Sequence, residues 1–195
     1  MSAPIEFWFD FSSPYAYFAA NSVESRLSRF GRTILWRPFL LGAAFKITGM
    51  GSLTHTPMRG DYAKRDWKRI ADSMSLPFSL PNHHPYRSQN SARTYYWLEE
   101  NAPESATLFA KRAFAAHFEQ GKDLTEKGAV LSLLPEAPAT LGNWLDSADA
   151  KAVLKSKTDE AISKGVFGSP FFIVDGEPFW GWDRLAFVER LLEGK

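Results

Sequence analysis

The opening of the chain changes from the two-residue period of a strand to the spacing of a helix. In residues 5–10, IEFWFD, apolar side chains alternate, and Trp8 adds an aromatic ring to the second face, which predicts a strand. From Pro14 onward, apolar residues recur at helical spacing until Gly31, which predicts a helix that this glycine ends. Residues 33–39, TILWRPF, predict a second strand, so the chain opens as β-α-β.

The middle of the chain, residues 41–164, shows helical patterns and no strand run comparable with those at the two ends. Three helices are predicted within it, over residues 104–120, 126–134 and 147–164, the last with Ser147 as its N-cap. The segment GMGSLTHTPMRG, residues 49–60, predicts a loop, and loops of this length usually line a cavity or another surface feature. The middle is therefore predicted to be an all-helical insertion.

The C-terminal segment returns to strand-like patterns. Residues 171–174 form a short apolar run, Asp175 and Gly176 are a strong hairpin-turn signal, and residues 179–180 predict the returning strand. A closing amphipathic helix follows, with Asp183 at its start.

The order of these elements predicts an α/β fold in two parts. Residues 1–40 and 166–195 are expected to form one discontinuous domain, and residues 41–165 an inserted helical domain. A chain of 195 residues, 45% of them hydrophobic and 15% aromatic, can bury the core that this arrangement needs.

Charge and hydropathy narrow the classes of function. Lysine and arginine total 23 against 22 aspartate and glutamate, a net charge of +1, so we expect no nucleic-acid binding. The start, MSAPIEFWFDF, has neither a basic leader nor a long apolar run, and no stretch approaches 18 apolar residues. We therefore expect a cytoplasmic protein that does not bind membranes.

The chain contains no cysteine, which changes the chemistry that can be considered. Disulfides, zinc–thiolate sites, iron–sulfur clusters and every mechanism that uses a protein thiol are excluded. A disulfide oxidoreductase is therefore excluded whatever the fold, and any sulfur chemistry must arrive with a ligand.

Ser13 is the residue whose position suggests chemistry. Pro14 suits the first turn of a helix, so Ser13 lies at or next to the N-cap, where a hydroxyl and unpaired backbone N–H groups favour an anion. A plain capping role explains Ser13 equally simply. A serine hydrolase is disfavoured because a base is needed and all four histidines lie in the middle block: His55, His83, His84 and His117.

Four motifs together resemble a known family. They are DFSSPY at residues 10–15, RPFLLGAAFK at 37–46, GVFGSP at 165–170 and FWGWDR at 179–184. The chain resembles the 2-hydroxychromene-2-carboxylate isomerases and the kappa-class glutathione transferases of the DsbA-like group, nearly from end to end. The resemblance implies a thioredoxin-like fold of the DsbA/kappa type, glutathione as cofactor and a homodimer.

The resemblance also implies roles for individual residues near the predicted N-cap. Ser13 is expected to donate a hydrogen bond to the sulfur of glutathione, and Pro14 and Tyr15 complete the motif beside the same ligand. Pro170, preceded by Ser169, is expected to be a cis-proline that faces Ser13 and leaves the preceding backbone free for the cysteinyl part of glutathione. An ordinary trans turn is the alternative at Pro170.

Further glutathione contacts are implied elsewhere in the chain. Asp183, with Trp182 beside it, is expected to meet the ammonium group of the γ-glutamyl end, or else only to cap the last helix. Two positions depart from the kappa pattern of asparagine and lysine, because this chain has Met50 and Arg59 there. Arg59 keeps a positive charge for the glycyl carboxylate. Met50 cannot make the amide contact, which weakens the expectation for glutathione binding.

The remaining charged residues and histidines are weaker candidates for a binding role. Lys46 is expected to meet a substrate carboxylate, or else to be a solvated helix lysine. Residues 64–69, KRDWKR, predict a solvated helix face. His83 and His84 are adjacent and have no carboxylate or thiolate beside them, so no metal site is expected.

The resemblance implies a reaction for the whole chain. We expect a glutathione-dependent isomerase that interconverts 2-hydroxychromene-2-carboxylate and trans-o-hydroxybenzylidenepyruvate, a small aromatic substrate. A kappa-like glutathione transferase or peroxidase would instead consume the thiol on an electrophile. A non-catalytic thioredoxin-fold binding module is a third possibility.

Overall fold

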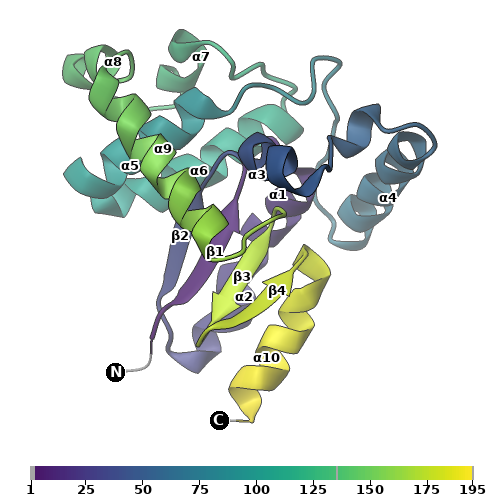
Figure 1. Cartoon of the computed structure of the whole chain (residues 1–195). Helices are drawn as coiled ribbons and strands as arrows, with labels where there is room; N and C mark the ends of the chain where they lie inside the picture. The colour runs from purple at the N-terminus through teal and green to yellow at the C-terminus, as the bar shows by residue number, and fades with distance from the viewer. Residues whose placement is uncertain (1–2, 135, 195) are drawn as a thin grey trace.

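Strands from the two ends of the chain form one sheet (Figure 1). The structure is a computed structural model and describes residues 3–134 and 136–194. The strands are β1 (Ile5–Phe9), β2 (Ile34–Pro38), β3 (Phe171–Val174) and β4 (Glu177–Trp180), in the spatial order β2-β1-β3-β4. β1 pairs parallel with β2 and antiparallel with β3, and β3 pairs antiparallel with β4. β1 therefore lies inside the sheet, between elements distant in sequence.

The helices lie mostly between β2 and β3, where the described residues form no strand. They are α1 (Pro14–Ala20), α2 (Val23–Leu27), α3 (Leu41–Thr48), α4 (Arg59–Ser73), α5 (Gln89–Asn101), α6 (Pro103–Phe118), α7 (Lys127–Leu131), α8 (Ala139–Trp144), α9 (Ala148–Ser163) and α10 (Leu185–Glu193). Short 3₁₀ turns cover residues 28–30, 53–55 and 182–184. The α/β fold and the helical content of the middle block are thus as predicted, and the division of the chain into two domains remains a prediction.

The prediction of one helix from Pro14 to Gly31 is wrong, because the helix breaks after Ala20. At the break, the Asn21 side-chain amide donates to the Tyr17 carbonyl at 2.9 Å, and the Ser22 hydroxyl donates to the Phe18 carbonyl at 2.9 Å. Side chains that satisfy carbonyls in this way compete with the continuing helix. Gly31 still ends the segment as predicted, with a φ of 63°.

The C-terminal hairpin is confirmed. Asp175 and Gly176 both have positive φ, 53° and 86°, the pair of values that a two-residue turn matching strand twist requires. β3 covers the predicted residues, and β4 begins two residues earlier than expected. The N-cap prediction for Ser147 is also confirmed, since its hydroxyl accepts from the Ala150 N–H at 3.1 Å.

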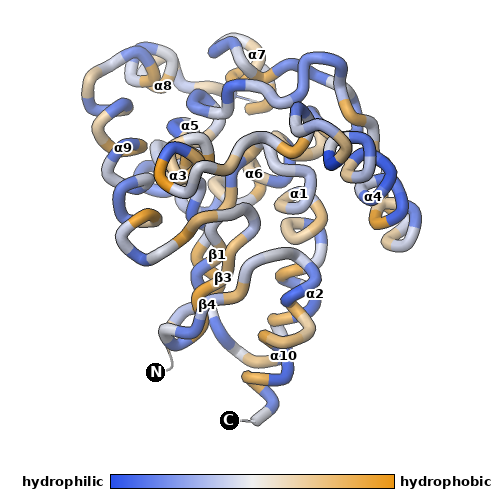
Figure 2. Tube along the Cα trace, turned by 45° about the vertical axis from the view of Figure 1, so that its right-hand side comes forward, coloured by the Kyte–Doolittle hydropathy of each residue, from blue (hydrophilic) through white to orange (hydrophobic). Residues whose placement is uncertain are grey.

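The core joins the sheet directly to the helical block. The ring of Phe9 in β1 lies 5.5 Å from that of Phe114 in α6, and Phe11 lies 5.2 Å from the same ring. The opposite face of the sheet buries Trp8 against Phe39, with ring centroids 6.4 Å apart. Figure 2 shows hydrophobic segments gathered on α1, α10 and the strands, whereas α4 is mostly hydrophilic.

The α4 sequence KRDWKR forms a solvated face, as predicted, for its four basic residues, while Trp67 is buried. In the part of the chain that the structure describes, no helix combines the length and the hydrophobicity needed to cross a bilayer.

Two buried histidines, His84 and His117, are joined by a chain of hydrogen bonds that ends on a backbone carbonyl. The Nδ1 atom of His117 lies 2.9 Å from the Lys122 carbonyl oxygen, so this nitrogen carries the hydrogen and the Nε2 atom accepts. That Nε2 lies 3.2 Å from Nδ1 of His84, which must therefore be the donor. Burial, reinforced by neighbouring histidines, lowers the pKa of His84 to about 3, and burial lowers the pKa of His117 to about 4. Both rings are neutral above pH 5.

The two neutral histidines predict that the folded protein loses stability in acid. The unfolded chain binds protons on these histidines near pH 6.5 and the folded chain does not, so stability is complete above that pH and falls as the pH drops. His84 alone should cost about 2 kcal/mol between pH 7.5 and pH 5. We expect urea unfolding to show a smaller loss over this range in His84→Gln than in the wild type. The exposed His55→Gln serves as control, and equal losses in all three proteins would contradict the assignment.

Candidate functional site

The turn from β1 into α1 places Ser13 at the start of the helix. The Ser13 N–H donates to the Asp10 carbonyl at 3.0 Å, which closes the turn. Ser13 has extended backbone angles, and its hydroxyl accepts from the Ala16 N–H at 3.2 Å. Pro14 occupies the first helical position, where its missing N–H has no consequence. The predicted N-cap is confirmed, and its hydroxyl lies where the positive end of α1 favours an anion.

Ser13 faces the other end of the chain. The Ser169–Pro170 bond is cis, as predicted. The Ser13 hydroxyl donates to the Ser169 carbonyl at 2.9 Å, and the Ser169 hydroxyl accepts from the Asp10 N–H at 2.8 Å. Ser13 and Ser169 are only 7% and 8% exposed. A hydroxyl has one proton, so Ser13 must turn it away from Ser169 before it can donate to a ligand.

Asp10 is a site residue that the sequence reasoning missed. Its Oδ1 atom accepts from the Ser12 N–H at 2.9 Å, the Ser12 hydroxyl at 2.8 Å and the Ser88 hydroxyl at 2.8 Å. Its Oδ2 atom accepts from the Leu41 N–H at 2.9 Å. The carboxylate is 5% exposed and joins the end of β1 to the starts of α3 and α5. An aspartate two residues before a serine at a strand end is a sequence signal for such a turn.

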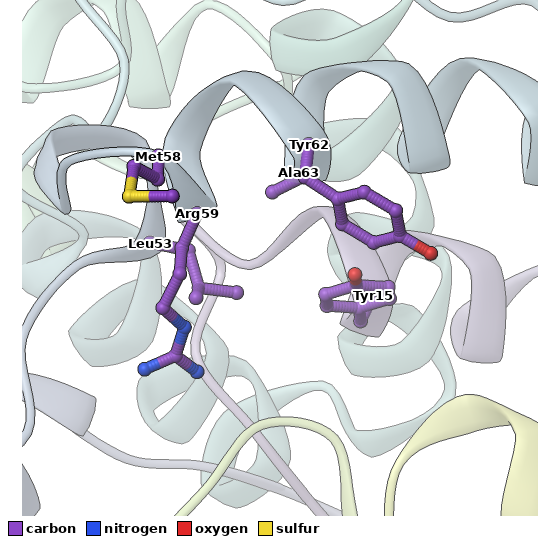
Figure 3. Close-up of a pocket in the computed structure, with 6 residues that line it drawn as sticks. All are labelled: Tyr15, Leu53, Met58, Arg59, Tyr62 and Ala63. Carbon is purple, nitrogen blue, oxygen red and sulfur yellow. The ribbon is translucent and has the colours of Figure 1, made fainter.

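A cavity of about 360 Å³ opens beside the first turn of α1 (Figure 3). It is lined by Tyr15 from α1, by Arg59, Tyr62 and Ala63 from α4, and by Leu53 and Met58 from the segment before α4. The expectation that residues 49–60 line a cavity is thus met, although a 3₁₀ turn forms within them. Gly60 lets α4 approach this segment, because a Cβ atom there would lie 2.7 Å from the Thr54 carbonyl oxygen.

The Tyr15 ring is held in place by a second residue that the sequence reasoning missed. The Tyr15 hydroxyl donates to Asp66 Oδ2 at 2.9 Å. Burial and the Asp66 carboxylate raise the pKa of the Tyr15 phenol above its usual range, so the phenol is neutral at physiological pH. Asp66 lies in the predicted charged helix face, and nothing in the sequence indicates that it turns inward toward α1.

The predicted residues near the last helix lie in a turn that is bonded to the cis-proline. The Gly181 N–H donates to the Pro170 carbonyl at 3.0 Å, which ties the turn containing Trp182 and Asp183 to the cis-proline. Asp183 is exposed and forms an ion pair with Arg184 at 3.4 Å. No side chain among the described residues caps this turn or α10, so the alternative of a capping Asp183 is not what the structure shows.

Two predicted residues lie apart from the cavity. Lys46 is exposed near the end of α3, and Met50 is 39% exposed just beyond it. The residues that line the cavity include neither of them. Within residues 3–134 and 136–194, no group of three or more histidine, aspartate or glutamate side chains is arranged to hold a metal ion.

Comparison with known proteins places the chain in a family. Residues 4–193 match the DSBA-like thioredoxin domain. The chain belongs to the DSBA-like thioredoxin domain family. Among solved structures, a 2-hydroxychromene-2-carboxylate isomerase superposes with a TM-score of 0.86 at 25% identity, over 97% of this chain and 94% of the other. The thioredoxin-like fold is thereby confirmed.

Two curated relatives with different names are about equally similar to this chain. The chain is 26% identical over 198 residues to a 2-hydroxychromene-2-carboxylate isomerase of Sphingobium xenophagum, covering 98% of this chain and 99% of the relative. It is 27% identical over 204 residues to glutathione S-transferase kappa 2 of Caenorhabditis elegans, covering 96% and 91%. The resemblance to both groups is confirmed, and identity alone does not favour either activity.

The hydrogen bonds that the Asp10 carboxylate accepts lead to a prediction about the free energy of unfolding. In Asp10→Asn, one oxygen becomes an NH₂ group that faces donors, so at least one charged hydrogen bond is lost. We expect a loss of about 2–4 kcal/mol in the free energy of unfolding, measured with urea. Asp61→Asn, at an exposed residue 3.9 Å from Lys64, should change it by less than about 0.5 kcal/mol. Equal effects of the two substitutions would contradict the role of Asp10.

Proposed function

We propose that this protein is a glutathione-dependent isomerase that interconverts 2-hydroxychromene-2-carboxylate and trans-o-hydroxybenzylidenepyruvate, with Ser13 as the residue that stabilises the glutathione thiolate. The observation that carries the proposal is the hydroxyl of Ser13 at the N-terminus of α1, facing the cis-proline. The isomerase relatives, similar over nearly the full chain, support the reaction. The absence of cysteine requires that the sulfur come from the ligand.

The residues present fit a thiol peptide. Ser13 offers a hydroxyl donor at the positive end of a helix, and the Ser169 carbonyl opposite it accepts hydrogen bonds. When bound, glutathione supplies a thiolate that adds reversibly to a conjugated double bond and so permits rotation about it. Ser13, Ser169 and the turn with Trp182 and Asp183 would hold the peptide, because all of them adjoin the cis-proline.

The effect of Ser13 on the thiol can be estimated. A free cysteine-like thiol has a pKa of about 8.5, so only a few per cent is ionised at neutral pH. One hydrogen bond to a charged group contributes about 1.5–3 kcal/mol, which corresponds to a pKa lower by about one or two units. Ser13 can therefore make a large fraction of the thiol ionised without any general base, provided that the Ser169 carbonyl finds another donor.

The hydrogen bonds of Ser13 also explain why a peptide thiol suits the site better than a simple one. When Ser13 turns its proton toward sulfur, the Ser169 carbonyl loses its donor. A buried carbonyl without a partner is costly. A peptide N–H on the ligand restores the hydrogen bond, whereas a small thiol leaves the carbonyl unpaired.

The test is Ser13→Ala with a matched capping control. We expect Ser13→Ala to lower the isomerisation rate about 10- to 100-fold and to raise the pKa of bound glutathione, since the thiolate loses its donor. Ser147→Ala removes the corresponding cap of α9 and should cost similar stability without loss of rate. Rates are followed by ultraviolet absorbance at catalytic glutathione concentrations. Full activity in Ser13→Ala, or in wild type without thiol, would refute the proposal.

A transferase of the kappa type is the second candidate, because the Caenorhabditis elegans relative is as similar as the isomerases. The same Ser13 hydroxyl would serve it. Measuring glutathione during turnover separates the two, since an isomerase returns the thiol and a transferase consumes it. If calorimetry detects no glutathione binding at millimolar concentration, a non-catalytic binding module is the better description.

A further inference from the structure

The cavity beside Tyr15 is lined mostly by aromatic and aliphatic side chains, which a site for the glycine end of glutathione does not need. Five of its six lining residues present rings or aliphatic side chains, and Arg59 contributes the only charge among them. Arg59, Tyr62 and Ala63 are spaced by three and four residues in α4, so they share one face of the helix. Figure 3 shows Arg59 on one side and the rings of Tyr15 and Tyr62 on the other. The cavity therefore combines flat apolar walls with one cation.

Arg59 is available to a ligand. Among the described residues, no carboxylate forms an ion pair with its guanidinium, and the nearby acids of α4 have other partners. Asp66 accepts the Tyr15 hydroxyl, and Asp61 lies 3.9 Å from Lys64. A guanidinium beside aromatic rings can bind a planar carboxylate through two parallel N–H···O bonds while its neighbours cover the attached ring.

We propose that this cavity is the site of the aromatic acid and that Arg59 binds its carboxylate, rather than the glycyl carboxylate of glutathione. This inference rests on the proposed function and assigns the cation differently from the resemblance, which gave Arg59 to glutathione and Lys46 to the substrate. Lys46 does not line the cavity. The apolar walls suit a fused ring and offer little to a tripeptide backbone, which needs hydrogen-bond partners.

Tyr15 lines the cavity and lies two residues after Ser13 in the chain. The two residues are separated by two positions in the first turn of α1, a rise of about 3 Å along the axis. The bond between Tyr15 and Asp66 fixes this wall. An acid held by Arg59 and covered by Tyr15 and Tyr62 would lie against α4 and the first turn of α1, the turn that follows Ser13.

The experiment measures binding with unreactive probes, so it does not depend on turnover. The probes are naphthalene-2-carboxylate and its neutral twin naphthalene-2-carboxamide, titrated by calorimetry with and without glutathione. We expect wild type to bind the carboxylate about 10- to 100-fold more tightly than the carboxamide, and Arg59→Met to lose this preference. Glutathione affinity should stay within about twofold in Arg59→Met. Arg65→Met, an exposed arginine of the same helix, is the control and should behave as wild type.

The remaining outcomes either overturn the inference or separate it from the proposed reaction. A weaker affinity of Arg59→Met for glutathione with an unchanged probe preference would return Arg59 to the glycyl carboxylate and overturn the inference. Failure of wild type to bind the carboxylate at millimolar concentration would overturn it as well. Arg59→Lys keeps the charge and should recover part of the preference, which separates a charge effect from misfolding. Tight, Arg59-dependent probe binding without isomerase activity would leave the cavity assignment standing and remove the proposed reaction.

Discussion

The contact between the end of β1 and the cis-proline is the interaction on which the rest of the site depends. Through it, the Asp10 N–H reaches the Ser169 hydroxyl and the Ser13 hydroxyl reaches the Ser169 carbonyl, at 2.8 and 2.9 Å. The Asp10 carboxylate extends the same network to the starts of α3 and α5. Three of these bonds are buried, those between Asp10 and Ser169, Ser13 and Ser169, and Ser88 and Asp10, so losing one of them leaves a polar group without a partner. The sheet places the two chain ends together, and this network fixes how Ser13 faces the cis-proline.

In the proposed function, the chemistry depends on a hydroxyl and a helix terminus rather than on an acid–base pair. Among the described residues, no histidine forms a hydrogen bond with Ser13, and His84 and His117 bond to each other and to the Lys122 carbonyl. A hydroxyl with one proton and two competing acceptors is instead a selective donor. In the proposed function, the Ser13 hydroxyl exchanges the Ser169 carbonyl for the thiolate of the ligand, and an N–H of the ligand then donates to that carbonyl.

The sequence predicts most of the features that depend on neighbouring residues, apart from one helix break, and misses side-chain contacts between distant segments. The cap at Ser13, the turn at Asp175 and Gly176, and the strand at residues 171–174 follow from local patterns, and all are found. The break after Ala20 was missed because helical spacing continues through it while side-chain hydrogen bonds end the helix. The donors to Asp10 from residues 41 and 88, and the pairing of Tyr15 with Asp66, join segments that only the fold brings together.

The positions of Met50 and Arg59 in the fold offer one explanation for both departures from the kappa pattern. Met50 is exposed outside the cavity, and Arg59 stands inside it among rings and aliphatic side chains. If the peptide contacts lie on the side of the cis-proline and the turn at Trp182, an asparagine at position 50 is not needed for them. The exchange of lysine for arginine then matters for a different ligand. A planar guanidinium stacks on aromatic rings and binds a carboxylate through two N–H groups, and an ammonium group does neither. The α4 side would thus select the acid, and the cis-proline side the thiol.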